Sequence, residues 1–175
     1  IVLREDATPG AVEAQDTQIV RQEPVFERPQ FSRQDPNALT LDYARYRQGQ
    51  GEWSAPLPVL TIYELLAQQE YRGPLSLSFT FEVADRPSQA AVVIEDAAQY
   101  RIRINGESIK YTGSGYWIDR SFHPIDVTSL VQQGSNEIQL DLDFRPLPLA
   151  QFSLARLFQR REGTELEAIY VIGDF

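Results

Sequence analysis

The dipeptide Asn105-Gly106 is the feature that most restricts how this chain can fold. It separates two runs of alternating residues, 100–104 and 107–111. A two-residue hairpin loop needs positive φ at both central positions, which Asn and Gly tolerate best. We therefore predict a tight antiparallel hairpin, in which Arg101 and Arg103 lie on the face opposite the neighbouring isoleucines.

Strand periodicity recurs along the chain. Residues 75–83 alternate between apolar side chains and Ser, Thr or Glu, as expected for a sheet with one face in the core and the other in water. Further strands are predicted at residues 37–42, 91–95, 137–144 and 166–172, with short helices at 61–69 and 129–132. Residues 149–161 fit either a helix or a loop across the end of the sandwich. The pattern indicates an all-β antiparallel sandwich, because strands and helices do not alternate as in a parallel sheet.

The chain divides by composition into two parts. Residues 1–36 are rich in Pro, Gln, Glu and Arg, and we predict that they form an extended lead-in or linker. Residues 37–175 carry the strand pattern, and 175 residues suffice for one domain with its own core. The sequence contains no methionine, and its residues 1–10 carry acid and proline rather than a charged start followed by an apolar run, so we expect it to be a piece of a longer protein.

Composition excludes several classes of function. The net charge of −9 and a pI of about 4.6 argue against a nucleic-acid partner, whose phosphates favour a basic face. The chain has no cysteine, so neither a disulfide nor a thiolate nucleophile is available. No apolar run reaches the roughly 18 residues of a membrane-spanning helix, so we expect no membrane partner.

A set of short motifs follows the hairpin in a fixed order. The set comprises Ile104-Asn105-Gly106, Gly115-Tyr116-Trp117, Ile125-Asp126-Val127-Thr128, Leu130, Gly134, Asn136 and Ile138. It resembles the sugar-binding jelly roll of family 2 glycoside hydrolases and of related large α-L-rhamnosidase-like bacterial proteins. The resemblance covers roughly residues 37–175.

The resemblance implies a galactose-binding-like jelly roll with one or two short helices. It also implies a bacterial parent protein whose catalytic acids lie in a separate barrel domain, and a secreted or periplasmic location. The expected partners are then the other domains of the same polypeptide and, as a further option, an oligosaccharide or polysaccharide.

Several motif residues have structural roles that follow from their chemistry alone. Asp126 or Thr128 can cap a short helical turn by accepting from its free N–H groups. Gly134 suits the left-handed position that ends such a turn. Asn136 is expected to hydrogen-bond loop backbone where the chain re-enters the sheet.

No catalytic constellation is predicted, so we do not expect the isolated chain to be an enzyme. His123 is the only histidine, and it precedes Pro124 in a predicted loop with no nucleophile elbow near any serine. Asp141 and Asp143 share a strand face at about the 7 Å spacing of two strand residues, which fits a glycosidase pair loosely. We favour a solvated outer face for both carboxylates.

Metal binding is open only to oxygen ligands, and we predict no metal site or cofactor. A structural calcium ion remains an alternative by resemblance to other jelly rolls, since such ions take six to eight oxygens. Its candidate ligands are Asp119, Asp126, Asp141 and Asp143.

Aromatic and polar residues gather where a saccharide could bind. Sugar sites combine flat aromatic faces with Arg, Asp or Asn groups that bond to hydroxyls. The candidates are Tyr116, Trp117, Asp119 and Arg120 in one loop, Arg103 in the hairpin, and Trp53 in a glycine-containing loop. The alternative for Trp117 is a buried plug at the sandwich end or a contact with a neighbouring domain.

We therefore expect a non-catalytic accessory module of a larger bacterial glycoside hydrolase, which supports the catalytic domain and can also bind carbohydrate. A free-standing lectin-like protein is the alternative. A hydrolase that uses Asp141 and Asp143 is the least favoured hypothesis.

Overall fold

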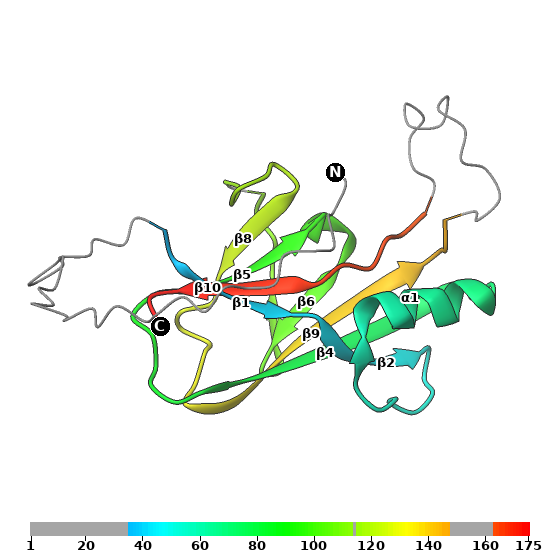
Figure 1. The fold of residues 1–175 in the computed structure, drawn as a ribbon, viewed down its shortest axis with the longest axis horizontal. Coiled ribbons are helices and arrows are strands. Elements are labelled where there is room, and N and C mark those ends of the chain that lie inside the picture. The colour runs from blue at the N-terminus through cyan, green and yellow to red at the C-terminus, as the bar shows by residue number, and fades with distance from the viewer. Residues whose placement is uncertain (1–34, 114, 148–162) are drawn as a thin grey trace, which may run out of the picture. The chain divides into compact units, whose positions relative to one another are not determined.

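The computed structural model describes residues 35–113, 115–147 and 163–175. The chain forms two units, Ile1–Gln34 and Asp35–Phe175, and all described residues belong to the second unit. This unit is a sandwich of two antiparallel sheets, as predicted (Figure 1). Most of the predicted lead-in and the whole of the ambiguous segment 149–161 lie outside the described residues.

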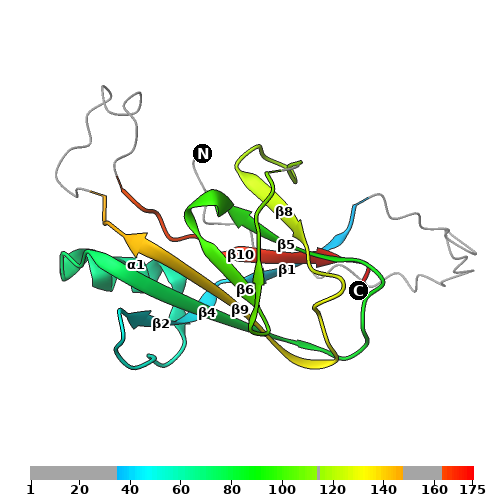
Figure 2. The same cartoon turned by 180° about the vertical axis from the view of Figure 1, so that it is seen from behind.

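The two sheets differ in size. The six-stranded sheet has the order β3 (Leu57–Pro58), β2 (Tyr43–Gln48), β4 (Gly73–Val83), β9 (Gly134–Phe144), β6 (Arg101–Ile104), β7 (Glu107–Ile109). The four-stranded sheet has the order β1 (Asn37–Leu41), β10 (Ile169–Gly173), β5 (Ala90–Glu95), β8 (Phe122–Asp126). The helix α1 (Val59–Gln68) lies beside β2 in both views (Figure 1 and Figure 2). Residues Ala97–Gln99 form a short 3-10 helix, η1.

The core lies between the sheets and centres on the pairing of β4 with β9. These strands pair from Gly73↔Phe144 to Val83↔Gly134. Their apolar faces are buried, as the alternation predicts. The buried residues on these faces are Leu75, Leu77, Phe79, Phe81, Ile138, Leu140, Leu142 and Phe144. Each such side chain contributes about 1.5–3 kcal/mol by leaving water.

The hairpin forms where it is predicted. Asn105 has φ 50° and Gly106 has φ 86°, the two positive values that a two-residue loop requires. The side chain of Asn105 also donates to the Leu130 carbonyl at 2.9 Å and accepts from the Glu137 N–H at 2.8 Å. This one amide therefore joins the hairpin to β9 and to the loop that precedes it.

Asn136 completes that connection. It is 1% exposed, accepts from the Gln132 N–H at 2.9 Å and donates to the Gln132 carbonyl at 2.7 Å. Gly134, with φ 88°, ends the turn in the left-handed region. The predicted backbone role of Asn136 and the left-handed conformation of Gly134 are both confirmed.

The segment around Asp126 differs partly from the prediction. Asp126 caps the following turn by accepting from the Thr128 N–H at 2.9 Å, and this bond lowers the pKa of the Asp126 carboxyl. The turn starts at Val127, whose carbonyl accepts from the Val131 N–H at 3.0 Å, two residues earlier than expected. Thr128 instead bonds β5, through Oγ1 and the Ala90 N–H at 3.0 Å.

The expectation that His123 lies in a loop is wrong, because β8 includes it opposite Ile94. Pro124 follows it inside the strand, opposite Val93. A strand tolerates proline when it lies at the edge of a sheet, since the missing N–H then faces away from the ladder. β8 is such an edge strand.

Candidate functional site

The loop between β7 and β8 carries most of the predicted sugar-binding residues. At its tip the Asp119 N–H donates to the Trp117 carbonyl at 2.7 Å across Ile118, which has φ 64°. A β-branched residue in this region is strained and needs support from its surroundings. Tyr116 and Ile118 are 62% and 79% exposed. The turn therefore presents an aromatic and an aliphatic side chain to solvent.

Asp119 stabilises this loop from within. Its Oδ1 atom accepts from the Ser121 N–H at 2.9 Å and from the Ser121 hydroxyl at 2.8 Å. These two hydrogen bonds lower the pKa of the Asp119 carboxyl. Arg120, the next residue, is exposed. Asp119 thus has a local structural role, whatever ligand the loop takes.

Trp117 packs on the four-stranded sheet. Its ring lies 5.5 Å from the ring of Tyr170 in β10, and Phe122 contacts the same tyrosine edge-on at 5.8 Å. Trp117 is half-buried. The geometry fits the packing alternative for Trp117, while its contact with saccharide stays a prediction.

Arg103 lies on the outer face of the other sheet, as the hairpin predicts. Its guanidinium donates to the Asp141 carboxylate at 2.7 Å, and Asp141 also accepts from the Ser76 hydroxyl at 2.6 Å and from Gln139 at 3.0 Å. Asp141 is buried, so the expected solvated position is wrong for it. Neighbouring strands supply enough polar side chains to cover this carboxylate. Asp143 does match that prediction, since it is exposed and pairs with Arg145 at 3.0 Å.

Trp53 lies against arginines of β2. The guanidinium carbon of Arg47 is 4.7 Å from the centre of the Trp53 ring, and that of Arg45 is 5.8 Å away. Such cation–π contacts contribute about 0.5–1 kcal/mol at exposed sites. The Nε atom of Arg47 is buried without a hydrogen-bond partner. Part of the Trp53 ring is therefore already occupied by the protein's own cations.

The structure divides the predicted sugar-binding residues into two groups. The strand register places Arg47, Ser76 and Asp141 side by side across β2, β4 and β9, so Trp53 and Arg103 belong to one face of the six-stranded sheet. Tyr116, Trp117, Asp119 and Arg120 belong to the loop that packs on the four-stranded sheet. No described contact joins the two groups, so they form separate candidate surfaces.

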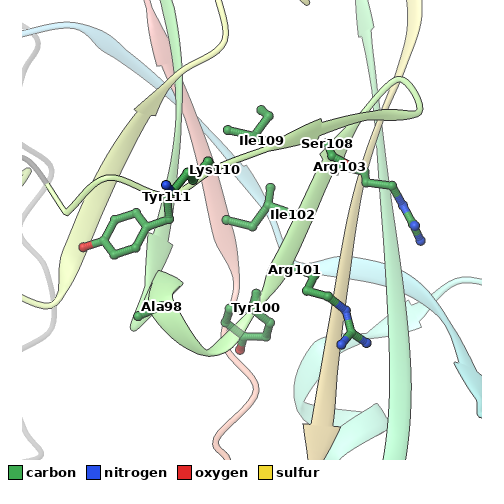
Figure 3. A pocket seen from close by; sticks show the side chains of 9 residues that line it. All are labelled: Ala98, Tyr100, Arg101, Ile102, Arg103, Ser108, Ile109, Lys110 and Tyr111. Atoms are coloured by element: carbon green, nitrogen blue, oxygen red, sulfur yellow. The ribbon is translucent and has the colours of Figure 1, made fainter.

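A third feature was not predicted from the sequence. A hollow of about 550 Å³ lies along β6 and β7, and Arg103 is the only predicted site residue that lines it (Figure 3). The remaining lining residues are Ala98, Tyr100, Arg101, Ile102, Ser108, Ile109, Lys110 and Tyr111. The basic residues flanking the hairpin are visible in the sequence, but the hollow that they line depends on where strand pairing ends.

The described residues do not assemble a recognisable hydrolytic or metal site. His123 lies 3.4 Å from the Gly115 carbonyl and contacts the Tyr111 ring, neither of which is a triad partner. Within the described ranges, no group of three or more His, Cys, Asp or Glu side chains is placed to hold a metal ion. The same part of the chain has no helix that is both long and apolar enough to cross a membrane.

The fold and these surfaces define an antiparallel β-sandwich module with polar and aromatic candidate surfaces. No protein-family model matches the chain, and no curated protein sequence matches it. Among solved structures, it is similar to a β-D-glucuronidase from Dictyoglomus thermophilum, with a TM-score of 0.52 and 11% identity over 82% of this chain. A β-glucuronidase from Ruminococcus gnavus gives 0.54 and 12% over 83%, and one from an uncultured Clostridium species gives 0.51 and 11% over 82%.

The chain spans only about 30% of the length of these solved chains: 29%, 31% and 30%, respectively. At 11–12% identity the similarity establishes the shared fold. It does not extend to the activity of those proteins.

Proposed function

We propose that this chain is a non-catalytic domain of a larger bacterial glycoside hydrolase related to family 2, with a galactose-binding-like jelly-roll topology. The observation that carries the proposal is the partial match to β-glucuronidase chains: 82% of this chain corresponds to 29% of a much longer one. The Asn105-Gly106 hairpin and the Gly134 to Asn136 segment, which carry the sequence resemblance, support the same relationship.

The proposed role of the module is to support and orient the catalytic domain. A rigid sandwich is suited to this role because its core is buried independently of any partner. The loop tip offers Tyr116 and Ile118, both largely exposed, as apolar contacts for a neighbouring domain. Removing them is expected to weaken that contact and to leave the sandwich folded.

The test uses the parent polypeptide. Turnover of a glycoside substrate and thermal stability are compared for the full protein and for variants with Tyr116→Ser or Ile118→Ser. We expect a lower melting temperature of the catalytic domain, or reduced turnover, relative to a Leu39→Ser variant on β1. A native polypeptide without any catalytic domain would contradict the proposal and favour the lectin-like alternative.

Direct saccharide binding through the same loop is the finer part of the proposal. Tyr116 is 62% exposed, so its ring face is available to cover the C–H side of a pyranose. Trp117→Ala is expected to reduce both saccharide affinity and stability, because the ring also packs on Tyr170. Titration calorimetry with neutral oligosaccharides checks this, with Tyr116→Ala as the variant that retains the packing. Undiminished affinity in Tyr116→Ala would place neutral saccharide elsewhere.

A further inference from the structure

The hollow beside β6 and β7 forms where their pairing ends. The paired part of the hairpin ends at Ile102↔Ile109, so the two chain segments beyond this pair are not paired with each other as strands. Figure 3 shows Lys110 and Tyr111 diverging from Tyr100 at this point. The space between them is part of the hollow of about 550 Å³, within the range of about 300–1,000 Å³ that small-ligand sites occupy.

The charge of this hollow contrasts with that of the chain. The lining includes Arg101, Arg103 and Lys110 and no carboxylate, in a chain of net charge −9. Arg103 is paired with Asp141, but no described carboxylate lies within ion-pair distance of Arg101 or Lys110. Like charges that share a concave surface raise the local potential and favour an anion there.

The rest of the lining is apolar or aromatic. Ile102 is buried, and Ile109, Tyr100 and Tyr111 are partly buried against the core. The Tyr111 ring is held by an edge-on contact with His123 at 5.3 Å. Figure 3 shows Lys110 beside Tyr111, whereas the side chains of Arg101 and Arg103 extend to the other side of β6. A ligand in the hollow would therefore meet the Tyr111 ring and aliphatic surface next to the Lys110 ammonium.

We propose that this hollow binds a carboxylate carried on a sugar ring, as in a uronic acid residue of an acidic oligosaccharide. Lys110 pairs with the carboxylate, Tyr111 beside it covers the C–H face of the ring, and Arg101 adds to the positive potential from the other side of β6. The choice of a saccharide rests on the proposed function, whereas the preference for an anion follows from the lining alone.

The experiment titrates the full 175-residue chain with trigalacturonate and, separately, with neutral galactotriose. Calorimetry gives the affinity, and amide NMR shifts locate the site. We expect trigalacturonate to bind more tightly, with shifts at residues 100–103 and 108–111, and to weaken as salt rises. Arg101→Gln combined with Lys110→Gln should weaken trigalacturonate at least about tenfold, the effect of losing a charged hydrogen bond.

The single variant Lys110→Gln is also measured, and its charge-matched control is Arg72→Gln, which removes one positive charge from an exposed position between α1 and β4. Arg72→Gln should leave trigalacturonate affinity within about twofold. Equal affinity for the two trisaccharides, or equal losses in Arg72→Gln and Lys110→Gln, would overturn the proposal. Binding of acetate as strong as that of trigalacturonate would overturn the saccharide part. These outcomes leave the accessory-domain proposal standing, since that depends on the parent polypeptide.

Discussion

At the scale of single residues, two aspartates on one strand face have different environments. Asp141 and Asp143 are two positions apart in β9. The first is buried and accepts from Arg103 and Ser76, while the second is exposed beside Arg145. A glycosidase pair would need both carboxylates directed at one substrate bond. Asp141 is instead committed to joining β4, β6 and β9, which argues for a structural role.

Asp141→Ala is expected to lower the free energy of unfolding by about 2 kcal/mol. Removing one partner of a fully buried ion pair costs about 3–5 kcal/mol, and the value is smaller here because the side chain of Arg103 is 38% exposed. Asp143→Ala is the matched control and should change stability by less than about 0.5 kcal/mol. Urea denaturation measures both variants. Equal effects would contradict the structural role of Asp141.

Tyr100 is expected to link folding to alkaline pH. Burial raises the pKa of its hydroxyl above the ordinary 10.0, and the carboxylates of Asp96, Glu167 and Glu95 add to the shift. The folded state therefore retains a proton that the unfolded state loses. This contribution is complete below pH 10 and decreases as pH rises further, by at most about 1.4 kcal/mol per pH unit.

The measurement is urea denaturation between pH 9 and pH 11.5 for the wild type and Tyr100→Phe. The variant should lose less stability than the wild type across this range. Tyr43→Phe is the control, because that ring is 58% exposed. If the free energy of unfolding fell equally with pH in all three proteins, Tyr100 would not be the source of the pH dependence.

At the scale of elements, local sequence signals act through the contacts that the sheets provide. The β6–β7 hairpin was predictable because Asn105-Gly106 satisfies a strict backbone requirement. Strand β4 was predictable because its alternation is complete over residues 75–83. Strand β2 was not predicted, because its residues 43–48 do not show a clear alternation of apolar and polar side chains. Arginine and tyrosine lie on its outer face, which is partly exposed to water and partly covered by Trp53. Their role becomes visible only once β4 lies beside them.

The same reasoning explains which parts of the candidate site the sequence could predict. Arg103 was placed on the correct face by alternation alone. Its pairing with Asp141 depends on the β6–β9 register, in which Arg101 lies opposite Asp141 and Arg103 opposite Gln139. The hollow depends on where hairpin pairing ends, which no local motif specifies. Features that depend on local alternation could therefore be predicted, whereas features that depend on the pairing of distant strands were missed.

Gly106→Ala is expected to destabilise the hairpin by about 1–2 kcal/mol. The backbone at this position has φ 86°, which costs any residue with a Cβ that amount, although no neighbouring atom lies within 4 Å of the added carbon. Ser108→Ala in β7 is the control and should be nearly neutral. Thermal unfolding compares the two. Equal stability of Gly106→Ala and wild type would contradict the hairpin conformation.

At the scale of the whole described unit, each sheet contributes its own candidate surface. The four-stranded sheet supports the loop with Tyr116 and Ile118, and the six-stranded sheet supports the basic hollow at β6 and β7. A domain that contacts a catalytic domain through one surface and an acidic saccharide through the other would use both. Each surface can be altered separately, because the residues that form them are on different elements.

The most direct test of the accessory-domain proposal is the mass of the native polypeptide that contains this sequence, measured on protein isolated with an antibody to the sandwich. We predict a chain roughly three times as long as these 175 residues, because the sandwich corresponds to 29–31% of the solved β-glucuronidase chains. It should also cleave a glycoside. A native protein of about 19.9 kDa with no attached catalytic domain would contradict the proposal.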